Sequence, residues 1–453
     1  SDGEPITAED ILFTYNAIRS DQVESARTYV WDGMASMEAP DPYTLVVTYE
    51  ELRCDALTNL GLQATPAHIY APDFSDVMTS PENEQPTVVN GPFTFQSWTR
   101  DDNIIIVRND NYWQGAPNMD GMIYRVIPDA GSRLAQLQNG EIDALRLQPN
   151  QLTSVADYPN ISVYKWDDDG YSYLSMNLAN PENPQPGLDE NGEVIPQDPH
   201  PILGDKAVRQ AIAGALDYDA IINDIYFGQG YRMAANVLPV VEWAYNTDLP
   251  LYSYDPDQAS ALLEEAGWVD SDGDGVREKD GQTLSLSLHT NAGNTTRENL
   301  GVYIQNALGQ VGFDIDFQPV DFGQLLELND NQTFDLIILG WTGVGSDPHD
   351  KALFGVDQDI PGSGFNSTSF YNERVEELYS LGNSVPGCAP EERAPYYKEI
   401  QEIFHDELPY VFLTGTVSNL GYNNRWDGLD PQPWAASEPI YWNTHEWYLR
   451  TAQ

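Results

Sequence analysis

Two cysteines, five lysines and the lack of any long hydrophobic run narrow what this 453-residue chain can be. Its 21 basic residues are outnumbered by 71 acidic residues, which gives a formal net charge of −50 and a pI near 4.1. Such an excess of carboxylates repels nucleic acids and anionic membranes, so we expect neither as a partner. No apolar stretch reaches the roughly 18 residues that a membrane span requires. The balance is typical of a secreted protein, or of one living in high salt, where self-repulsion is screened.

The sequence also lacks the common catalytic signatures. It contains no H-E-x-x-H, G-x-S-x-G, P-loop or G-x-G-x-x-G pattern. Its six histidines are scattered, and among 71 acidic residues a pair of carboxylates arises by chance. We therefore predict that the protein is not an enzyme, and we keep a secreted glycoside hydrolase as a minor alternative.

The two cysteines, Cys54 and Cys388, leave two possibilities open. Their separation matches no metal-binding motif, and neither has a C-x-x-C partner. A protein outside the cytoplasm tolerates a disulfide, but the sequence does not show whether the two sulfur atoms lie within bonding distance. The pair could be one disulfide or two free thiols.

The clearest secondary-structure pattern lies between residues 255 and 341. Apolar residues recur at helical spacing in three stretches, and they alternate or run together in three others. The predicted order is helix 255–267, strand 284–290, helix 298–312, strand 313–320, helix 321–328 and strand 334–341. Strands separated by helices favour a parallel or mixed sheet with helices on its faces. We therefore predict an α/β fold, and the length of the chain indicates two or three lobes.

The last of these strands, FDLIILGW, runs into a glycine-rich loop. Ligands of open α/β sheets bind outside the carboxyl ends of the strands, and Trp341 lies at that end. We predict that Trp341 offers a flat apolar face to a ligand in a cleft. Gly340, Thr342 and Gly343 would allow close approach of the backbone, and Asp347 would anchor the loop or make a polar contact. The alternative is that the indole is a core anchor.

An acidic segment, DSDGDGVREKDG at 270–281, matches the beginning of a calcium-binding loop. Asp270, Asp272 and Asp274 fall at positions 1, 3 and 5, which brings three carboxylates around a tight turn. Position 12 is Gly281 in place of the usual bidentate glutamate. The further candidates are the carbonyl of Val276 at position 7 and the side chains of Glu278 and Asp280. The segment predicts a structural Ca²⁺ site, with an acidic turn as the alternative.

Stretches spread over the whole chain resemble one known family. They include SDGEPITAEDILFTYNAI at the beginning, then TPAHIY, VNGPFTFQSW, DNYWQGAPNMDGMIYRVIPDAGSRLAQLQNGEIDAL and AVRQAIAGALDYDAII, and finally FDLIILGWTG, YNERVEEL and ELPYVFL. No single motif is decisive, but their collinear order is specific. The chain resembles the family 5 solute-binding proteins of ABC importers, whose members bind dipeptides, oligopeptides, nickel complexes or cello-oligosaccharides.

The resemblance implies a periplasmic-binding-protein-like fold, with two hinged α/β lobes, an extra lobe, and mixed sheets flanked by helices. By this comparison residues 1–88 belong to the extra lobe (lobe II), 89–200 to lobe I and 201–420 to lobe III, and 421–453 return to lobe I. The ligand would be enclosed between lobes and delivered to an ABC permease. Family members usually carry a further amino-terminal segment with a lipoprotein signal. We expect that segment as a partner, and we expect an extracytoplasmic protein (periplasm or cell surface) anchored to lipid through it.

The resemblance also bears on the ligand. Peptide-binding members place an aspartate three residues after the tryptophan, where it pairs with the α-ammonium of the peptide; here that position is Val344. A buried ammonium without a partner is costly, so this form of recognition does not carry over. We expect a peptide as the ligand, with an oligosaccharide as the alternative because tryptophan and tyrosine suit stacking on sugars. Further candidate cleft residues, which could equally be ordinary packing residues, are Tyr171, Tyr173, Asn177 and Trp243.

Overall fold

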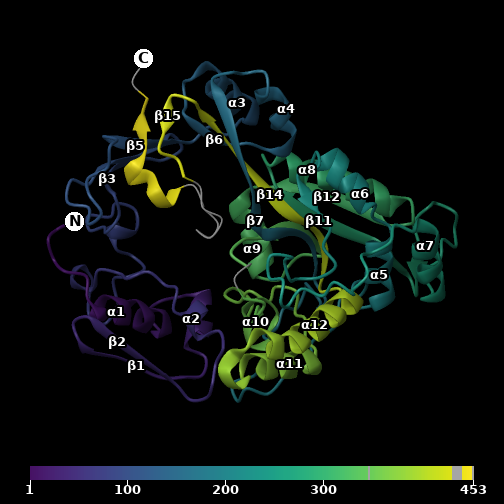
Figure 1. Ribbon diagram of the computed structural model, residues 1–453. Coiled ribbons are helices and arrows are strands. Elements are labelled where there is room, and N and C mark those ends of the chain that lie inside the picture. The colour runs from purple at the N-terminus through teal and green to yellow at the C-terminus, as the bar shows by residue number, and fades with distance from the viewer. Residues whose placement is uncertain (345–346, 431–440, 451–453) are drawn as a thin grey trace.

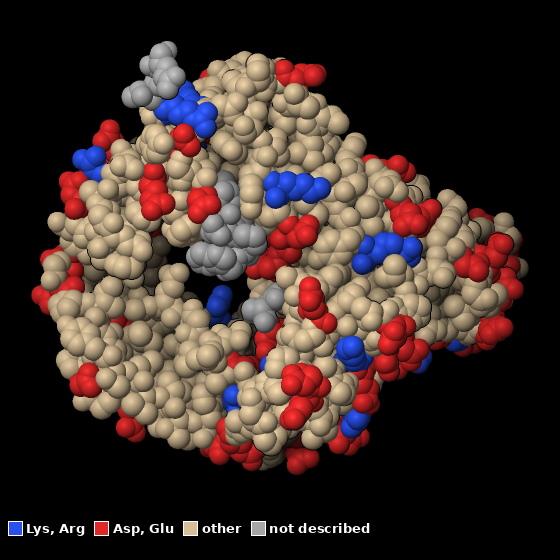
Figure 2. All heavy atoms as spheres, in the orientation of Figure 1, with Lys and Arg blue, Asp and Glu red and all other residues tan. Residues whose placement is uncertain are grey.

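The computed structural model describes residues 1–344, 347–430 and 441–450. An N-terminal lobe (residues 1–88) and an upper lobe face a larger α/β body across a central opening (Figures 1 and 2). None of the helices in these described ranges combines the length and the apolar character needed to cross a membrane.

A seven-stranded mixed sheet forms the centre of the body. Its strands lie in the order β12, β11, β13, β7, β14 and β6, and β8 also pairs with β14. β11 is parallel to β12 and β13, whereas β7 is antiparallel to β13 and β14. The strands are β6 (Ala144–Arg146), β7 (Ile161–Met176), β8 (Gly230–Tyr231), β11 (Ser285–Asn291), β12 (Asp314–Val320), β13 (Leu336–Trp341) and β14 (Tyr410–Asn423).

Three helices form where the apolar spacing predicts: the first precedes the parallel strands, and the other two connect them. They are α7 (Pro256–Glu265), α8 (Thr295–Gly309) and α9 (Phe322–Asp330). Each helix begins after a residue whose side chain accepts a hydrogen bond from a backbone N–H of the first turn, which the helix itself leaves unpaired. These capping residues are Asp255, Asn294 and Asp321. The order of helices and strands predicted between residues 255 and 341 is confirmed.

The two faces of the sheet bury different side chains. One face packs against α5 (Lys206–Gly214), α7 and α8, and its core is mainly aliphatic. The other packs against α11 (Glu373–Asn383) and α12 (Pro390–Glu407), and its core is rich in aromatic residues. Successive residues of β7 alternate between these cores, as strand geometry requires: Leu174 lies on the aliphatic side and Tyr173 on the aromatic side.

The N-terminal lobe is a small unit with its own core. A hairpin of β1 (Met34–Asp41) and β2 (Thr44–Tyr49) packs with α1 (Ala8–Arg19), and a short helix, α2 (Ala56–Asn59), follows. The fully buried side chains at the centre are Tyr15, Val30, Met34 and Met37. The lobe therefore has a core of its own, separate from those of the body.

The upper lobe contains a three-stranded antiparallel sheet and two helices. The sheet is β3 (Phe93–Thr99), β4 (Asn103–Arg108) and β5 (Gly121–Arg125), and the helices are α3 (Ala130–Asn139) and α4 (Leu152–Val155). A last strand pair, β15 (Trp426–Asp427) and β16 (Tyr448–Leu449), completes it. Short elements of the body include α6 (Tyr218–Ala220), a π-helical turn at Ile221–Ile225, β9 (Glu278–Lys279), β10 (Gln282–Thr283) and α10 (Lys351–Phe354).

Two long paired strands, β7 and β14, join the upper lobe to the body. At one end Trp166 and Leu420 belong to the core of the upper lobe. At the other end Leu174 and Val411 belong to the core of the body. This pair is therefore the natural hinge between the two. The lobe boundaries expected from the sequence stay predictions, and the range 421–453 lies partly outside the described residues.

Cys54 and Cys388 form a disulfide, with Cα atoms 5.3 Å apart and a separation of 334 positions in the sequence. The bond joins the N-terminal lobe, just before α2, to the body just before α12. Beside it the backbone N–H of Cys54 donates to the carbonyl of Asn383 at 2.8 Å. Of the two possibilities that the sequence leaves open, the structure shows the disulfide.

Candidate functional site

Trp341 lies at the carboxyl end of β13 and is half-buried. Its indole stacks on Tyr173 with ring centres 6.2 Å apart, and Phe365 meets it edge-on at 5.7 Å. Tyr173 in turn stacks on Tyr410 at 4.0 Å. The indole N–H donates to the hydroxyl of Tyr410 at 3.4 Å. These contacts fix the plane of the indole and leave part of it exposed to the space outside the sheet.

A cavity of about 360 Å³, here called the front cavity, lies between this loop and the N-terminal lobe. The body contributes Trp341, Thr342, Gly343, Val344, Asp347, His349 and Lys351, among others. The N-terminal lobe contributes Arg27, Tyr29, Asp32, Arg53 and Asp55. Figure 2 shows the molecule hollowed between these two parts. The cavity therefore joins residues that are far apart in the sequence and belong to different lobes.

Asp347 lies in the wall of the front cavity and is held by an arginine. Arg393 donates two hydrogen bonds to its carboxylate, at 2.8 and 2.9 Å, and the backbone N–H of His349 donates a third at 2.9 Å. The side chains of Arg393 and Asp347 are only 5% and 14% exposed. Arg393 also lies over the ring of Trp243 at 5.0 Å. Asp347 is therefore a loop anchor, and Trp243 packs on that anchor.

Asp55 is the main polar contact between the N-terminal lobe and the body. Burial would raise the pKa of Asp55, but hydrogen bonds from Arg53 and Asn383 and the nearby His349 lower it to about 2. Arg53 donates twice, at 2.9 and 2.6 Å, and Asn383 donates from the body at 2.9 Å. The carboxylate is thus charged at neutral pH and fully satisfied.

Three further titratable groups of the front cavity have shifted pKa values. Burial lowers the pKa of His349 to about 4, so its imidazole is neutral. Burial raises the pKa of Asp350 to about 6, although Tyr379 and Asn236 donate to it at 2.6 and 2.7 Å. Asp32 keeps much of its surface exposed to the cavity, yet the protein around it displaces water. That desolvation, followed by repulsion from Asp357, raises its pKa to about 6.

A second cavity of about 380 Å³, here called the rear cavity, lies beside the hinge strands. The body contributes Ser172, Tyr226, Asn294, Thr296, Arg297 and Gly340, and the segments near the upper lobe contribute Arg146, Gln148, Asp168 and Thr416–Asn419. Trp341 and Thr342 line both cavities. The end of β13 therefore separates two spaces that one ligand could occupy together.

The other residues predicted for the cleft have different places. Tyr171 is buried opposite Trp341 in the strand pairing and lines the rear cavity. Tyr173 is buried behind the indole and lines neither cavity. Asn177 does not lie in the cleft: it follows the other end of β7, where its amide donates to the carbonyls of Gln332 and Phe334. The expected placement of Asn177 is corrected because the chain leaves the strand there and the side chain pairs backbone groups.

Two glycines, one at the end of β13 and one in the loop that follows, have a definite role. Gly343 has φ +77°, a conformation that side chains rarely tolerate. A Cβ added at Gly340 would lie 3.0 Å from the carbonyl of Tyr171 and 3.2 Å from Nη2 of Arg297. Gly340 thus leaves room for the arginine, and Gly343 turns the chain into the loop.

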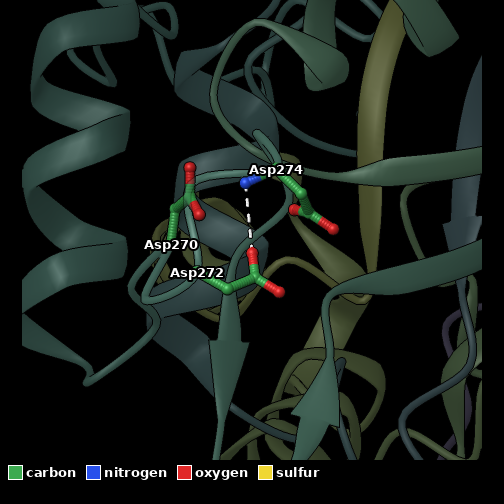
Figure 3. A group of neighbouring side chains, drawn as sticks. All are labelled: Asp270, Asp272 and Asp274. Atoms are coloured by element: carbon green, nitrogen blue, oxygen red, sulfur yellow. Dashed lines mark hydrogen bonds between the residues drawn. The ribbon is translucent and has the colours of Figure 1, made fainter.

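The acidic segment 270–281 lies on the surface of the body, away from both cavities. Carboxylate oxygens of Asp270, Asp272 and Asp274 lie within 4.8 Å of one another (Figure 3). The segment's other predicted ligands, Glu278 and Asp280, are not part of this group. Glu278 instead accepts hydrogen bonds from Ser271. Three oxygens are fewer than the six to eight that Ca²⁺ prefers, so the site would need Val276 and water as well.

Sequence reasoning missed the polar residues that hold the site together. These residues are Arg393 on one helix, Asp55 in a loop and Arg297 on another helix. They lie too far apart in the sequence for a short motif to include them. The sequence carries one faint signal: arginine is scarce in this acidic chain, and an arginine is almost never fully buried without a partner.

Comparison with known proteins places the chain in a family. The family model for bacterial extracellular solute-binding proteins, family 5 (middle part), matches residues 1–355. The oligopeptide-binding protein AppA of Bacillus subtilis is 28% identical over 459 residues, which cover 99% of this chain and 78% of AppA. The dipeptide-binding protein of Escherichia coli is 24% identical over 90% of this chain and 73% of its own length.

Solved structures show the same fold. AppA of Bacillus subtilis in complex with a nonapeptide superposes with a TM-score of 0.87 and 26% identity, over 99% of this chain and 85% of that one. NikZ of Campylobacter jejuni in complex with Ni(L-His) has a TM-score of 0.83 and 22% identity, over 98% and 85% of the two chains. The predicted fold is thereby confirmed. The chain belongs to family 5 of the bacterial extracellular solute-binding proteins.

Proposed function

We propose that the protein is the extracytoplasmic substrate-binding component of an ABC importer, and that its ligand is a peptide held in the front and rear cavities. The observation that carries the proposal is the position of Trp341, half-exposed at the end of β13 and shared by both cavities. The similarity to AppA, solved with a nonapeptide, supports a peptide as the ligand. So do relatives named for oligopeptide and dipeptide binding.

The front cavity favours contacts along the peptide over capture of its N-terminus by the loop. Val344 offers no charge, and the backbone N–H of this residue donates to the carbonyl of Asp169 at 2.9 Å. Asp347 is already neutralised by Arg393. A ligand ammonium would instead find Asp32, whose charge is disfavoured by desolvation and then by neighbouring Asp357. We expect Trp341 to contribute apolar contact area and the loop backbone to contribute hydrogen bonds.

The same geometry suits transport better than turnover. The family consists of solute-binding proteins, and a carrier must release its ligand unchanged. Closure about β7 and β14 would enclose the peptide, as in other hinge-bending proteins. Delivery to a membrane permease and attachment to lipid stay predictions.

A structural Ca²⁺ ion at the segment 270–281 is a separate proposal. It is supported by the approach of the three aspartates at its tight turn. It has no bearing on the ligand, because none of these residues lines either cavity.

The proposed function is tested by identifying the molecule that co-purifies with the protein. Denaturation followed by mass spectrometry should release an intact peptide, and adding that peptide back should raise the melting temperature. Recovery of an oligosaccharide would favour the alternative ligand class. Cleavage of an added peptide or oligosaccharide would show a hydrolase and contradict the proposal.

Trp341→Ala should weaken peptide binding by more than about tenfold, because a stacked aromatic surface is worth roughly 1.4 kcal/mol or more. The measurement is isothermal titration calorimetry with the recovered peptide. Trp98→Ala is the matched control, since Trp98 lies on β3 and lines neither cavity. Unchanged affinity of the Trp341 variant would assign the indole to the core.

A further inference from the structure

We infer that the rear cavity is a subsite for a carboxylate group of the ligand, and that Arg297 is the residue that binds it. The inference rests on the proposed function and adds to it the chemical group that the second cavity recognises. It follows from Arg297, a guanidinium that lines this cavity and forms no ion pair within the described part of the chain.

Arg297 lies in the first turn of α8 and lines the rear cavity. Its Nη1 donates to the side-chain oxygen of Asn291 at 2.9 Å. A guanidinium carries five N–H donors, so most of its hydrogen-bonding capacity is left for other acceptors. Within the described part of the chain, Arg297 takes part in no ion pair. Besides burial, the groups that act on its pKa are the phenols of Tyr226 and Tyr173, which are themselves neutral because burial raises their pKa values.

Burial lowers the pKa of Arg297, which means that the protein disfavours its charge where it stands. Arginine nevertheless stays protonated, because its ordinary pKa lies far above neutrality. The other buried arginine of the site, Arg393, has Asp347 as its partner. Arg297 is partly buried and lacks an equivalent partner among the described residues, and a carboxylate arriving with the ligand would supply it.

The surroundings of Arg297 are built to leave the guanidinium accessible. Gly340 lies against Nη2, where any side chain would crowd it. The N-terminal end of α8, through Asn294 and Thr296, lines the same cavity and favours negative charge. Arg146 lines it from the side of the upper lobe. The charged side chains that line the rear cavity are thus Arg297, Arg146 and, on the side of the hinge strands, Asp168.

One carboxylate, that of Asp168, also lines the rear cavity. It accepts a hydrogen bond from the hydroxyl of Ser418, on β14. It makes no ion pair with Arg297. Asp168 and Ser418 therefore lie on the hinge-strand side of the cavity, and the side formed by α8 and Gly340 remains for an anionic group.

The rear cavity adjoins the indole of Trp341, against which the ligand is proposed to lie. Trp341 and Thr342 line both cavities, so a peptide that contacts the indole in the front cavity can extend into the rear one. The carboxylate that reaches Arg297 could be the C-terminus of the peptide or an acidic side chain. The two sources share one chemistry, and the experiment distinguishes them.

The test uses alanine peptides from the dipeptide to the nonapeptide, each as the free acid and as the C-terminal amide. Calorimetry on the intact protein first selects the free acid that binds most tightly. Its amide should bind the native protein about ten- to a hundredfold more weakly. An amide that carries one internal glutamate should bind like the amide if the C-terminus is recognised, and like the acid if a side chain is.

Arg297→Gln should bind the acid as weakly as the amide, whereas Arg297→Lys should keep part of the discrimination. Arg374→Gln is the matched control, because Arg374 lies on the surface of α11 and pairs with Glu399. A glutamine variant that still prefers the acid as strongly as the native protein would overturn the inference. Its circular dichroism and melting temperature show whether it is folded, and an unfolded variant shifts the decision to Arg297→Lys.

If the proposed peptide-binding function is wrong, the experiment gives a different result from that expected if only the carboxylate subsite is wrong. If no alanine peptide binds the native protein, the peptide proposal fails. Oligogalacturonate and its neutral galactose counterpart then replace the peptides. A preference for the acidic sugar that Arg297→Gln abolishes would retain the carboxylate subsite, and binding of neither sugar would overturn it.

Discussion

Two acid-rich loops of the body differ in the burial of their carboxylates and in the groups that donate hydrogen bonds to them. In the loop after β13, Asp347 and Asp350 are largely buried and accept hydrogen bonds from side chains of other elements. In the segment 270–281, Asp270, Asp272 and Asp274 are exposed and accept only backbone N–H groups of their own turn. The total charge of −50 does not distinguish these loops. Their contacts with the rest of the fold do.

Asp347→Asn should produce the largest effect on stability. The change leaves the buried guanidinium of Arg393 without an anion, and removal of one partner from such a pair costs about 3 kcal/mol. Urea denaturation in the presence of a chelator measures the loss. Asp272→Asn is the counterpart in the exposed loop and should change the free energy of unfolding by less than about 0.5 kcal/mol. If both variants lost the same free energy of unfolding, the two loops would not differ in how their carboxylates contribute to stability.

The next largest effect should be the pH dependence of stability, which reports on titratable groups of the buried loop. The folded pKa of His349 is about 4, below its unfolded value of about 6.5, so the folded state excludes a proton that the unfolded state binds. Its contribution is therefore complete above pH 6.5 and is lost as the pH falls towards 4, by up to about 3 kcal/mol. Asp350 acts in the other direction. Its raised pKa of about 6 means that stability is lost as the pH rises from about 4 to 6.

Melting temperatures measured across this range separate the two groups. His349→Gln should remove the loss of stability on the acid side. Asp350→Asn should remove the loss that occurs as the pH rises from about 4 to 6, so the acid-side loss due to His349 is no longer offset and becomes steeper. His289→Gln, at a partly exposed position on β11, serves as the control. A native-like profile in the His349 variant would show that this imidazole is not the group responsible.

Calcium should produce the smallest effect and only in the exposed loop. At ten times its dissociation constant, Ca²⁺ would stabilise the protein by about 1.4 kcal/mol. Differential scanning calorimetry with Ca²⁺ and with a chelator measures this. Asp270→Asn should abolish the shift, and Asp347→Asn should retain it. If Ca²⁺ does not move the melting temperature of the native protein, the segment is an acidic turn.

The parts of the fold that the sequence predicts are those with local causes. Apolar spacing and capping residues such as Asn294 lie within a few positions of the helices that they define, so the alternation between 255 and 341 is readable. The position of Trp341 follows from a general rule about where parallel strands end. These features need no knowledge of distant neighbours.

The features that the sequence does not predict are pairings over long distances. Arg393 meets Asp347 across 46 residues, and Cys54 meets Cys388 across 334. The chain contains so many carboxylates that composition cannot choose the partner of an arginine. The sequence predicts that Asn177 lines the cleft because it continues the alternation of Tyr171 and Tyr173. The strand ends before it, however, and its side chain donates to backbone carbonyls instead.

The bond between Cys54 and Cys388 makes the molecule a closed ring. The chain links the N-terminal lobe to the upper lobe, β7 and β14 link the upper lobe to the body, and the disulfide returns to the start. While the disulfide is intact, the N-terminal lobe and the body cannot separate at that point, and they can only rotate about it. The disulfide therefore limits how far the N-terminal lobe and the body can separate when a ligand enters between them.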